Sequence, residues 1–328
     1  MITPRAFHLI IKHLNEIDQR VSLKMLSKRP WGEVSLTSFL CDLLDKDTQP
    51  DEKIDYGILQ LNQDLQSESK LTGIELSIES KQFSPMYERY VSQSDLGIKI
   101  IYENDFEPKL SWTRPFLLQA KKLMAKKLEP VLYDESSRFE SKDKGQEERI
   151  DILKTVIGDS IKYLYFCPRP EKTSPYVEQK LAYLRTKLLN EEIFDFTFGL
   201  ELYNELKNGQ STIGAGIFIA KTNADIQNLG MVHQSIFKDT IPFSWFIPML
   251  FLGNMEKYGL YPNDARKDKI TEKIISGDTS IIQTIKDKIN PGQSNLPDNF
   301  TIFPSHVLTI KYAVGRDFNP DNNFIENG

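Results

Sequence analysis

Residues 161–167, IKYLYFC, constrain the fold more than any other stretch of the sequence, and Pro168 and Pro170 follow them closely. The stretch is a nearly unbroken run of residues that favour β-strands. It lacks the apolar–polar alternation of a strand with one face in water, which is typical of a strand buried inside a sheet. We therefore expect residues 161–167 to form a buried strand.

Helical and strand-like patterns alternate before this strand. Apolar residues recur with helical spacing over residues 7–21, 33–44 and 146–157. Residues 74–78 alternate apolar and polar side chains, and residues 96–102 form a further apolar run, as strands do. With one more strand after that run, the order is helix, helix, strand, strand, strand, helix, strand. This order predicts an α/β fold with a mixed β-sheet.

The functional hypothesis depends on residues 93–123. Asp95 precedes one apolar run, a polar connection follows, and residues 116–118 then lead into Gln119 and Lys121. Two apolar runs joined by a polar segment indicate two strands and a loop. In that arrangement the acid of the first strand and the amide and lysine of the second lie at neighbouring strand ends.

A helix is the alternative for the second run. Pro115 suits the first turn of a helix, and the apolar residues between positions 116 and 128 also fit helical spacing. In a helix, the side chains of Gln119 and Lys121 would diverge and no common site would form. The choice between strand and helix over residues 116–123 therefore decides whether the site exists.

The second half of the chain follows a proline-rich stretch at residues 168–175, which is the expected boundary. We expect a first domain over residues 1–168 and a C-terminal α/β region over residues 169–328. The sequence assigns no role to this region, for which protein interaction and DNA binding are the two alternatives. This region carries helical patterns at residues 176–190 and 267–289, and strand patterns at residues 212–221 and 300–312. Its most apolar stretch, residues 241–252, is too short to span a bilayer and is expected to be a buried core segment.

Composition limits the class of protein. The 328 residues carry a formal net charge of −5, which argues against a protein that coats nucleic acid through bulk charge. A local basic cleft stays compatible with this total, because the field at a site depends on charge placement. Cys41 and Cys167 stand far apart in apolar runs and form no zinc spacing, which indicates buried thiols in a reducing compartment. No targeting segment is evident, so a cytoplasmic protein away from the membrane is expected.

The residue types around Asp95 suit phosphodiester hydrolysis. Mg²⁺, or Mn²⁺ in its place, prefers oxygen ligands, which the Asp95 carboxylate, the Gln119 amide and the Ala120 carbonyl would supply. Lys121 points the same way as Gln119 on a strand, and its ammonium can orient a water or stabilise transition-state charge. Glu33 could complete the metal shell through a water, although a carboxylate at a helix start is also favoured by the helix dipole alone.

This ordered set of residues resembles the motif of PD-(D/E)xK nucleases. Asp95 is followed, after a hairpin, by Gln119-Ala120-Lys121, the variant in which glutamine replaces the middle acid. Glu33 matches the glutamate that many members carry on the helix preceding the sheet. The resemblance covers roughly the first half of the chain.

The sequence is similar, more narrowly, to a group of bacterial members. Glu33 is followed by Leu36-Thr37, Glu88 stands seven positions before Asp95, and a later helix carries Gln146. The chain also departs from the usual pattern. Glutamine takes the place of the more common acid at the middle position, and a serine, not a proline, precedes Asp95.

The resemblance implies a restriction-endonuclease-like mixed β-sheet flanked by helices and a metal-dependent endonuclease that cuts DNA with Mg²⁺. The implied catalytic residues are Asp95, Gln119, Lys121 and Glu33, and the implied metal ligands are Asp95, Gln119, Ala120 and Glu33. Glu88 and Gln146 are implied with less weight. A group of basic residues is expected beside the cut phosphate, namely Arg114, Lys121, Lys122, Lys126 and Lys127.

Such nucleases commonly serve bacterial restriction or defence against phages and plasmids, and an ATPase or another defence-system subunit is a partner that this setting implies. A homo-oligomer is compatible with the sequence. Two alternatives stay open. The chain could be a non-catalytic interaction subunit with a nuclease-like fold, in which case an exposed segment at residues 245–252 would mark the partner surface. It could also be a nuclease that acts on RNA.

Overall fold

The computed structural model describes residues 2–51, 53–68, 73–82, 95–140, 144–170, 196–208, 214–252, 265–278, 280–281 and 304–315. Glu88 and the helix expected at residues 176–190 lie outside the described residues. The side chain of Gln146 lies outside them as well, although its backbone belongs to a described helix.

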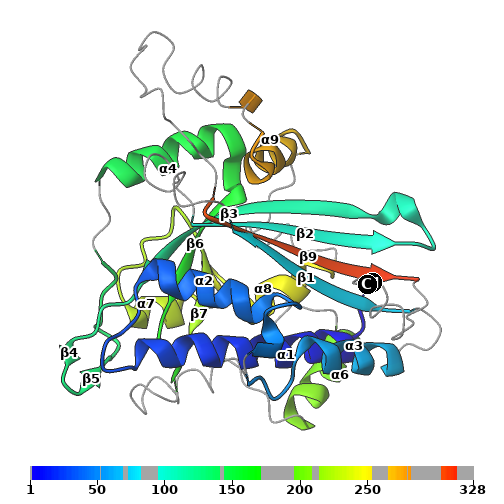
Figure 1. Ribbon diagram of the computed structural model, residues 1–328, viewed down its shortest axis with the longest axis horizontal. Coiled ribbons are helices and arrows are strands. Elements are labelled where there is room, and N and C mark those ends of the chain that lie inside the picture. Colours follow the sequence, from blue (N-terminus) through cyan, green and yellow to red (C-terminus); the bar gives the residue numbers. More distant parts are fainter. Residues whose placement is uncertain are drawn as a thin grey trace.

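Seven strands of the described chain form one mixed sheet (Figure 1). They are β1 (Glu75–Gln82), β2 (Leu96–Asn104), β3 (Trp112–Lys122), β6 (Ile161–Phe166), β7 (Ile217–Lys221), β8 (Thr240–Pro242) and β9 (His306–Val314). Their order in the sheet is β1-β9-β2-β3-β6-β7-β8. The pairs β2–β9 and β3–β6 are parallel, and the other neighbours are antiparallel. A separate short hairpin joins β4 (Lys127–Leu128) to β5 (Val131–Leu132).

Helices flank this sheet, which confirms the α/β fold. The α-helices are α1 (Pro4–Met25), α2 (Glu33–Leu44), α3 (Ile58–Glu68), α4 (Lys144–Ile157), α6 (Phe196–Asn208), α7 (Leu229–Gln234), α8 (Phe243–Leu250) and α9 (Ala265–Ser276). Short 3₁₀ turns occur at η1 (Gln49–Asp51), η3 (Pro108–Leu110) and η4 (Gly158–Ser160). In Figure 1, α4 and α9 lie above the sheet, and α1, α2 and α3 lie below it.

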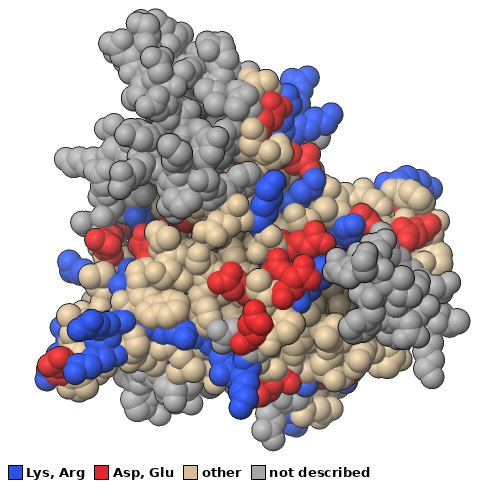
Figure 2. Space-filling view, in the orientation of Figure 1, with Lys and Arg blue, Asp and Glu red and all other residues tan. Residues whose placement is uncertain are grey.

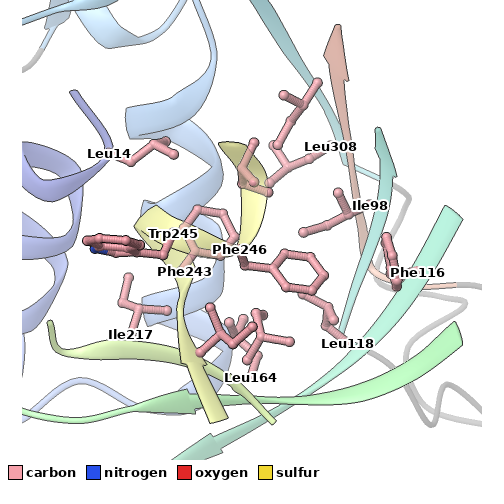
Figure 3. Close-up of a cluster of buried hydrophobic side chains, with 14 of the residues drawn as sticks. Leu14, Ile98, Phe116, Leu118, Leu164, Ile217, Phe243, Trp245, Phe246 and Leu308 are labelled. Atoms are coloured by element: carbon pink, nitrogen blue, oxygen red, sulfur yellow. The ribbon is translucent and has the colours of Figure 1, made fainter. Parts of the chain in front are cut away.

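Neighbouring residues of β2 show that the sheet is covered on both faces. A Cβ added at Gly97 would meet the side chain of Ile275 in α9. The next side chain, Ile98, points the other way, into a cluster that contains Phe246 of α8 (Figure 3). Because both faces of the central strands are buried, their apolar residues follow one another without the alternation of a half-exposed sheet.

The main core lies between the sheet and the layer formed by α1 and α8 (Figure 3). Phe246 packs edge-on against Phe116 of β3, with ring centroids 5.2 Å apart, and Trp245 packs against Phe7 of α1 at 5.7 Å. Every residue of α8 is buried. This confirms a core segment at residues 241–252 and removes the exposed apolar surface that the interaction-subunit alternative required there.

Residues 116–122 lie in β3, so the strand prediction for this stretch is confirmed and the helix alternative is wrong. The helical spacing of its apolar residues is a consequence of burial on both faces, where a strand is apolar at nearly every position. Pairing on both edges holds the strand, with Leu96 opposite Leu118 on one side and Tyr163 opposite Gln119 on the other.

The boundary predicted after residue 168 is not a boundary of the sheet. Strands β7 and β8 extend the sheet beyond β6, and β9 lies between β1 and β2. Strands from both halves of the chain therefore share one sheet and one core. Cys41 and Cys167 are both buried free thiols, as predicted. Across the described helices, none combines the length and apolarity that a membrane crossing requires.

Candidate active site

The site forms where β3 extends past the first residue of β2. Leu96 begins β2 opposite Leu118, and β3 continues for four more residues along β6. The backbone groups of successive strand residues point to opposite edges. The amides of Ala120 and Lys122 therefore point toward the β2 side, beyond the point where β2 begins. The carboxylates of Asp95 and Glu33 accept hydrogen bonds from these two amides.

Asp95 accepts a hydrogen bond from the first of these amides, that of Ala120. Its Oδ2 atom receives a hydrogen bond from the Ala120 amide at 2.8 Å and another from the Gln119 side-chain Nε2 at 2.5 Å. The Asp95 amide in turn donates to the Leu118 carbonyl at 2.8 Å. The acid is thus fixed from both its backbone and its side chain against the end of β3.

Glu33 accepts a hydrogen bond from the second amide, that of Lys122. Its Oε1 atom receives a hydrogen bond from the Lys122 amide at 2.8 Å. Glu33 is the first residue of α2, which begins after Gly32 in an extended conformation, so the helix N-terminus directs this carboxylate at the strand edge. Two strand residues span about 7 Å. The two carboxylates therefore line the same edge of β3 at about that spacing.

Burial raises the pKa of the Glu33 carboxyl above its ordinary value. The Lys122 amide and the positive charge of Lys121 oppose this effect, and the negative charge of Glu140 adds to it. The positive charge of Lys121 thus favours the charged form of Glu33. A favourable interaction between the Glu33 carboxylate and the dipole of α2 does not by itself explain the hydrogen bond from β3 to this carboxylate.

Gln119 and Lys121 point to the same face of β3 and are nearly enclosed, with 4% and 6% of their surface exposed. Gln119 uses its Nε2 atom for Asp95, whereas its Oε1 atom is buried without a hydrogen-bond partner. A buried amide oxygen without a partner is unfavourable by about 1–3 kcal/mol. A half-turn of the amide would bring this oxygen to the Asp95 side, where a cation would satisfy both groups.

The donor set fits a hard divalent cation. It consists of the Asp95 carboxylate, the Gln119 amide oxygen, the Ala120 carbonyl and, further along the edge, the Glu33 carboxylate. Mg²⁺ accepts such oxygen ligands and keeps several waters. Within the described residues, no group of three or more His, Cys, Asp or Glu side chains is placed to hold a metal. A site here would therefore rely on amide and carbonyl oxygens beside its two acids.

The other predicted residues have different positions. The prediction that Arg114 lies beside the site is wrong. Arg114 precedes Lys121 by seven strand residues, roughly 23 Å, and pairs with Asp268 of α9 at 2.7 Å. Lys126 pairs with Asp134 at 2.8 Å, while Lys127 is exposed on the hairpin that follows β3.

Ser305 and His306, which the sequence did not indicate, hold the backbone of Asp95, and Ser38 contacts His306. The carbonyl of Asp95 accepts hydrogen bonds from the Ser305 hydroxyl at 2.6 Å and from the His306 amide at 3.3 Å. The His306 ring contacts Ser305 and also Ser38 of α2. These residues come from distant parts of the chain, so no local spacing in the sequence could have connected them.

The fold and the site together define an α/β protein with a mixed sheet that carries two carboxylates, an amide and a lysine at the end of a central strand. No family model, curated protein or solved structure matches the chain.

Proposed function

We propose that the chain is a metal-dependent nuclease that hydrolyses phosphodiester bonds in DNA. The observation that carries the proposal is the convergence of Asp95 and Glu33 on one edge of β3, with the enclosed Gln119 and Lys121 side chains beside them. An enclosed lysine and a buried amide oxygen without a hydrogen bond both lower the stability of the fold. Such clusters of enclosed polar groups are typical of functional sites.

In the proposed reaction, Asp95, Gln119, Ala120 and Glu33 would hold Mg²⁺. The ion, when bound, would neutralise charge on the phosphate and make a bound water more acidic. The Lys121 ammonium donates hydrogen bonds to the attacking water or to a phosphate oxygen, which stabilises the negative charge of the transition state. The amides of Ala120 and Lys122 keep the two acids in place throughout.

Surface charge supports a nucleic-acid substrate. Figure 2 shows Lys and Arg side chains gathered over the β4–β5 hairpin, whereas acidic side chains gather over the middle of the same face. Lys127 of β4 is exposed, and so is Arg138, whose carbonyl accepts a hydrogen bond from the Met124 amide just before the hairpin. Both side chains of the Lys126–Asp134 ion pair are well exposed, so the pair contributes little to stability. Lys126 can therefore exchange Asp134 for a phosphate of the substrate.

A cleavage assay with matched variants tests the proposal. Wild type, Asp95→Ala and Lys121→Ala are incubated with plasmid, single-stranded DNA and RNA in Mg²⁺ or Mn²⁺, and with EDTA. Lys99→Ala is the control, because Lys99 is a strand lysine four residues after Asp95, roughly 13 Å along β2, and pairs with Glu272. We expect metal-dependent cleavage of DNA by wild type and Lys99→Ala, and a loss of about 10³-fold in the other two variants.

Equal background in all four proteins would contradict a nuclease, and cleavage of RNA alone would change the substrate class. The acidic total charge of the chain supports recruitment to DNA by a partner or through a homo-oligomer. A role in bacterial defence beside an ATPase subunit is part of the proposal and rests on the motif resemblance. Adding such a subunit to the assay tests it.

A further inference from the structure

We infer that His306 is a positioning residue that fixes the two acids of the candidate site relative to each other. The inference adds to the proposed function a residue from the C-terminal strand. It rests on the metal site of that proposal for its consequence, but its geometry can be tested without a metal. Four hydrogen bonds and the place of β9 in the sheet carry it.

The hydrogen bonds of Ser305 determine the tautomer of His306. The Ser305 hydroxyl lies 2.6 Å from the Asp95 carbonyl, which can only accept, so the hydroxyl donates its single hydrogen there. The same oxygen lies 3.0 Å from Nδ1 of His306 and must accept from it. Nδ1 therefore carries the proton. In the neutral ring, Nε2 then accepts from the Ser38 hydroxyl, which lies 2.9 Å away.

This chain of hydrogen bonds joins the elements that carry the two acids. Ser38 belongs to α2, whose first residue is Glu33. At the other end, Ser305 and the His306 amide hold the carbonyl of Asp95 at the start of β2. His306 also pairs with Leu96, the residue after Asp95, in the parallel β2–β9 ladder. The buried imidazole thus sets the position of α2 against the first residues of β2.

The consequence concerns the amides of β3. Asp95 reaches the Ala120 amide and Glu33 reaches the Lys122 amide, two residues apart on the same strand edge. Their distance depends on how α2 sits against β2, and His306 connects the two. Removal of the imidazole frees both acids to shift, although neither loses a direct contact. Residues that orient metal ligands in this way typically change metal affinity by about 10–100-fold when replaced.

Amide hydrogen exchange tests the geometry in the metal-free protein. In His306→Ala, exchange at Ala120 and Lys122 is expected to accelerate by about fivefold or more. The Leu123 amide, which donates to Phe166 on the other edge at 3.0 Å, is expected to keep its protection. His306→Asn retains a donor near the Nδ1 position and is expected to restore protection at Ala120. Ser38→Ala provides a milder variant with expected acceleration at Lys122.

His13→Ala is the matched control for a general loss of stability. His13 is also a buried histidine, and its ring contacts the Tyr56 carbonyl at 2.8 Å, away from the site. Equal acceleration at Ala120, Lys122 and Leu123 in His306→Ala, or the same pattern in His13→Ala, would overturn the positioning role. So would unchanged exchange at Ala120 and Lys122 in both His306→Ala and Ser38→Ala.

Titration with Mn²⁺ separates this inference from the proposed function. We expect wild type and His13→Ala to bind Mn²⁺ with equal affinity and His306→Ala to bind it about 10–100-fold more weakly. If wild type binds Mn²⁺ and His306→Ala binds it equally well, the positioning role is overturned while the metal site stands. If wild type binds no Mn²⁺, the metal site fails, and the exchange pattern alone then decides whether His306 positions the two acids.

Discussion

Gln119 shows how a single residue type sets the state of the site without a metal. Its Nε2 donates to Asp95 at 2.5 Å, so the neutral amide stabilises the carboxylate. A glutamate there would put two like charges at hydrogen-bond distance, which raises the pKa of one of them. The same neutrality leaves one oxygen of Gln119 buried without a partner. The site is therefore compatible with folding in the absence of a cation and retains a ligand for one.

Lys162 gives a prediction for the pH dependence of stability. The residue is 1% exposed on β6, and burial, with the nearby charges of Lys221 and Lys154, lowers its pKa from 10.5 to about 8, partly opposed by Asp159. Below about pH 8 the ammonium is charged in both the folded and the unfolded chain, and the burial of this charge lowers the stability of the folded state. Between about pH 8 and 10.5 only the unfolded chain binds the proton, so stability rises with pH.

We therefore expect Lys162→Met to stabilise the protein at pH 7 by about 3 kcal/mol and to lose this advantage as pH rises toward 10. Urea denaturation of variant and wild type at pH 7, 8, 9 and 10 measures the difference. Lys99→Met, which removes a partly exposed lysine of β2, is the control for the loss of a strand lysine and should give no comparable stabilisation at pH 7. A constant difference for Lys162→Met would contradict the lowered pKa.

At the scale of elements, α1 lies close to the backbone at Gly216, the residue before β7. Asp18 of α1 accepts hydrogen bonds from the Gly216 amide, from the Ile217 amide at 2.7 Å and from Arg169 at 2.8 Å. A Cβ at Gly216 would overlap the Ser22 hydroxyl and the Cys167 carbonyl. Only a glycine lets the backbone approach the helix this closely.

Gly216→Ala is therefore expected to destabilise the protein by about 2–4 kcal/mol. Thermal denaturation followed by circular dichroism measures the loss. Gly32→Ala is the control, since a Cβ at Gly32 would meet nothing within 4 Å and only an N-cap preference of about 1 kcal/mol is at stake. Equal melting temperatures for the two variants would show that α1 moves away from β7 without cost.

The elements of the first half could be predicted from local patterns, for physical reasons. Helix α2 begins and ends where the sequence pattern does, because a one-sided apolar stripe is a local property. β3 was ambiguous, because burial on both faces makes strand and helix patterns alike. The acids, the amide and the lysine could be identified by residue type. Ser38, Ser305 and His306 could not, because only the tertiary fold brings Ser305 and His306 to Asp95 and Ser38 to His306.

At the scale of the whole molecule, the sheet depends on strands from both halves of the chain. We expect a fragment of residues 1–168 not to fold cooperatively, because it lacks β7, β8 and β9, and because β1 and β2 both lose β9 as a pairing partner. Thermal melts and amide spectral dispersion measure this. Co-expression with residues 169–328 is the control and should restore the melt. A sigmoidal melt from residues 1–168 alone would support the predicted boundary instead.

The domain boundary was predicted at residue 168 because prolines and a change of composition are local signals. Strand order is not a local property. The apolar run near the C-terminal end could be recognised as a strand, but nothing in its residues states that it lies between β1 and β2, more than 200 positions earlier.

The position of β9 also sets the order in which the site can be built during synthesis. A ribosome releases the chain from its N-terminus, so Glu33, Asp95 and Lys121 leave the exit tunnel long before residues 306–314. Until β9 is released, β1 and β2 have a strand-wide gap between them, and the carbonyl of Asp95 lacks the donors that hold it. The nascent chain therefore carries all the chemical groups of the candidate site without their geometry, and it acquires that geometry only when β9 joins the sheet.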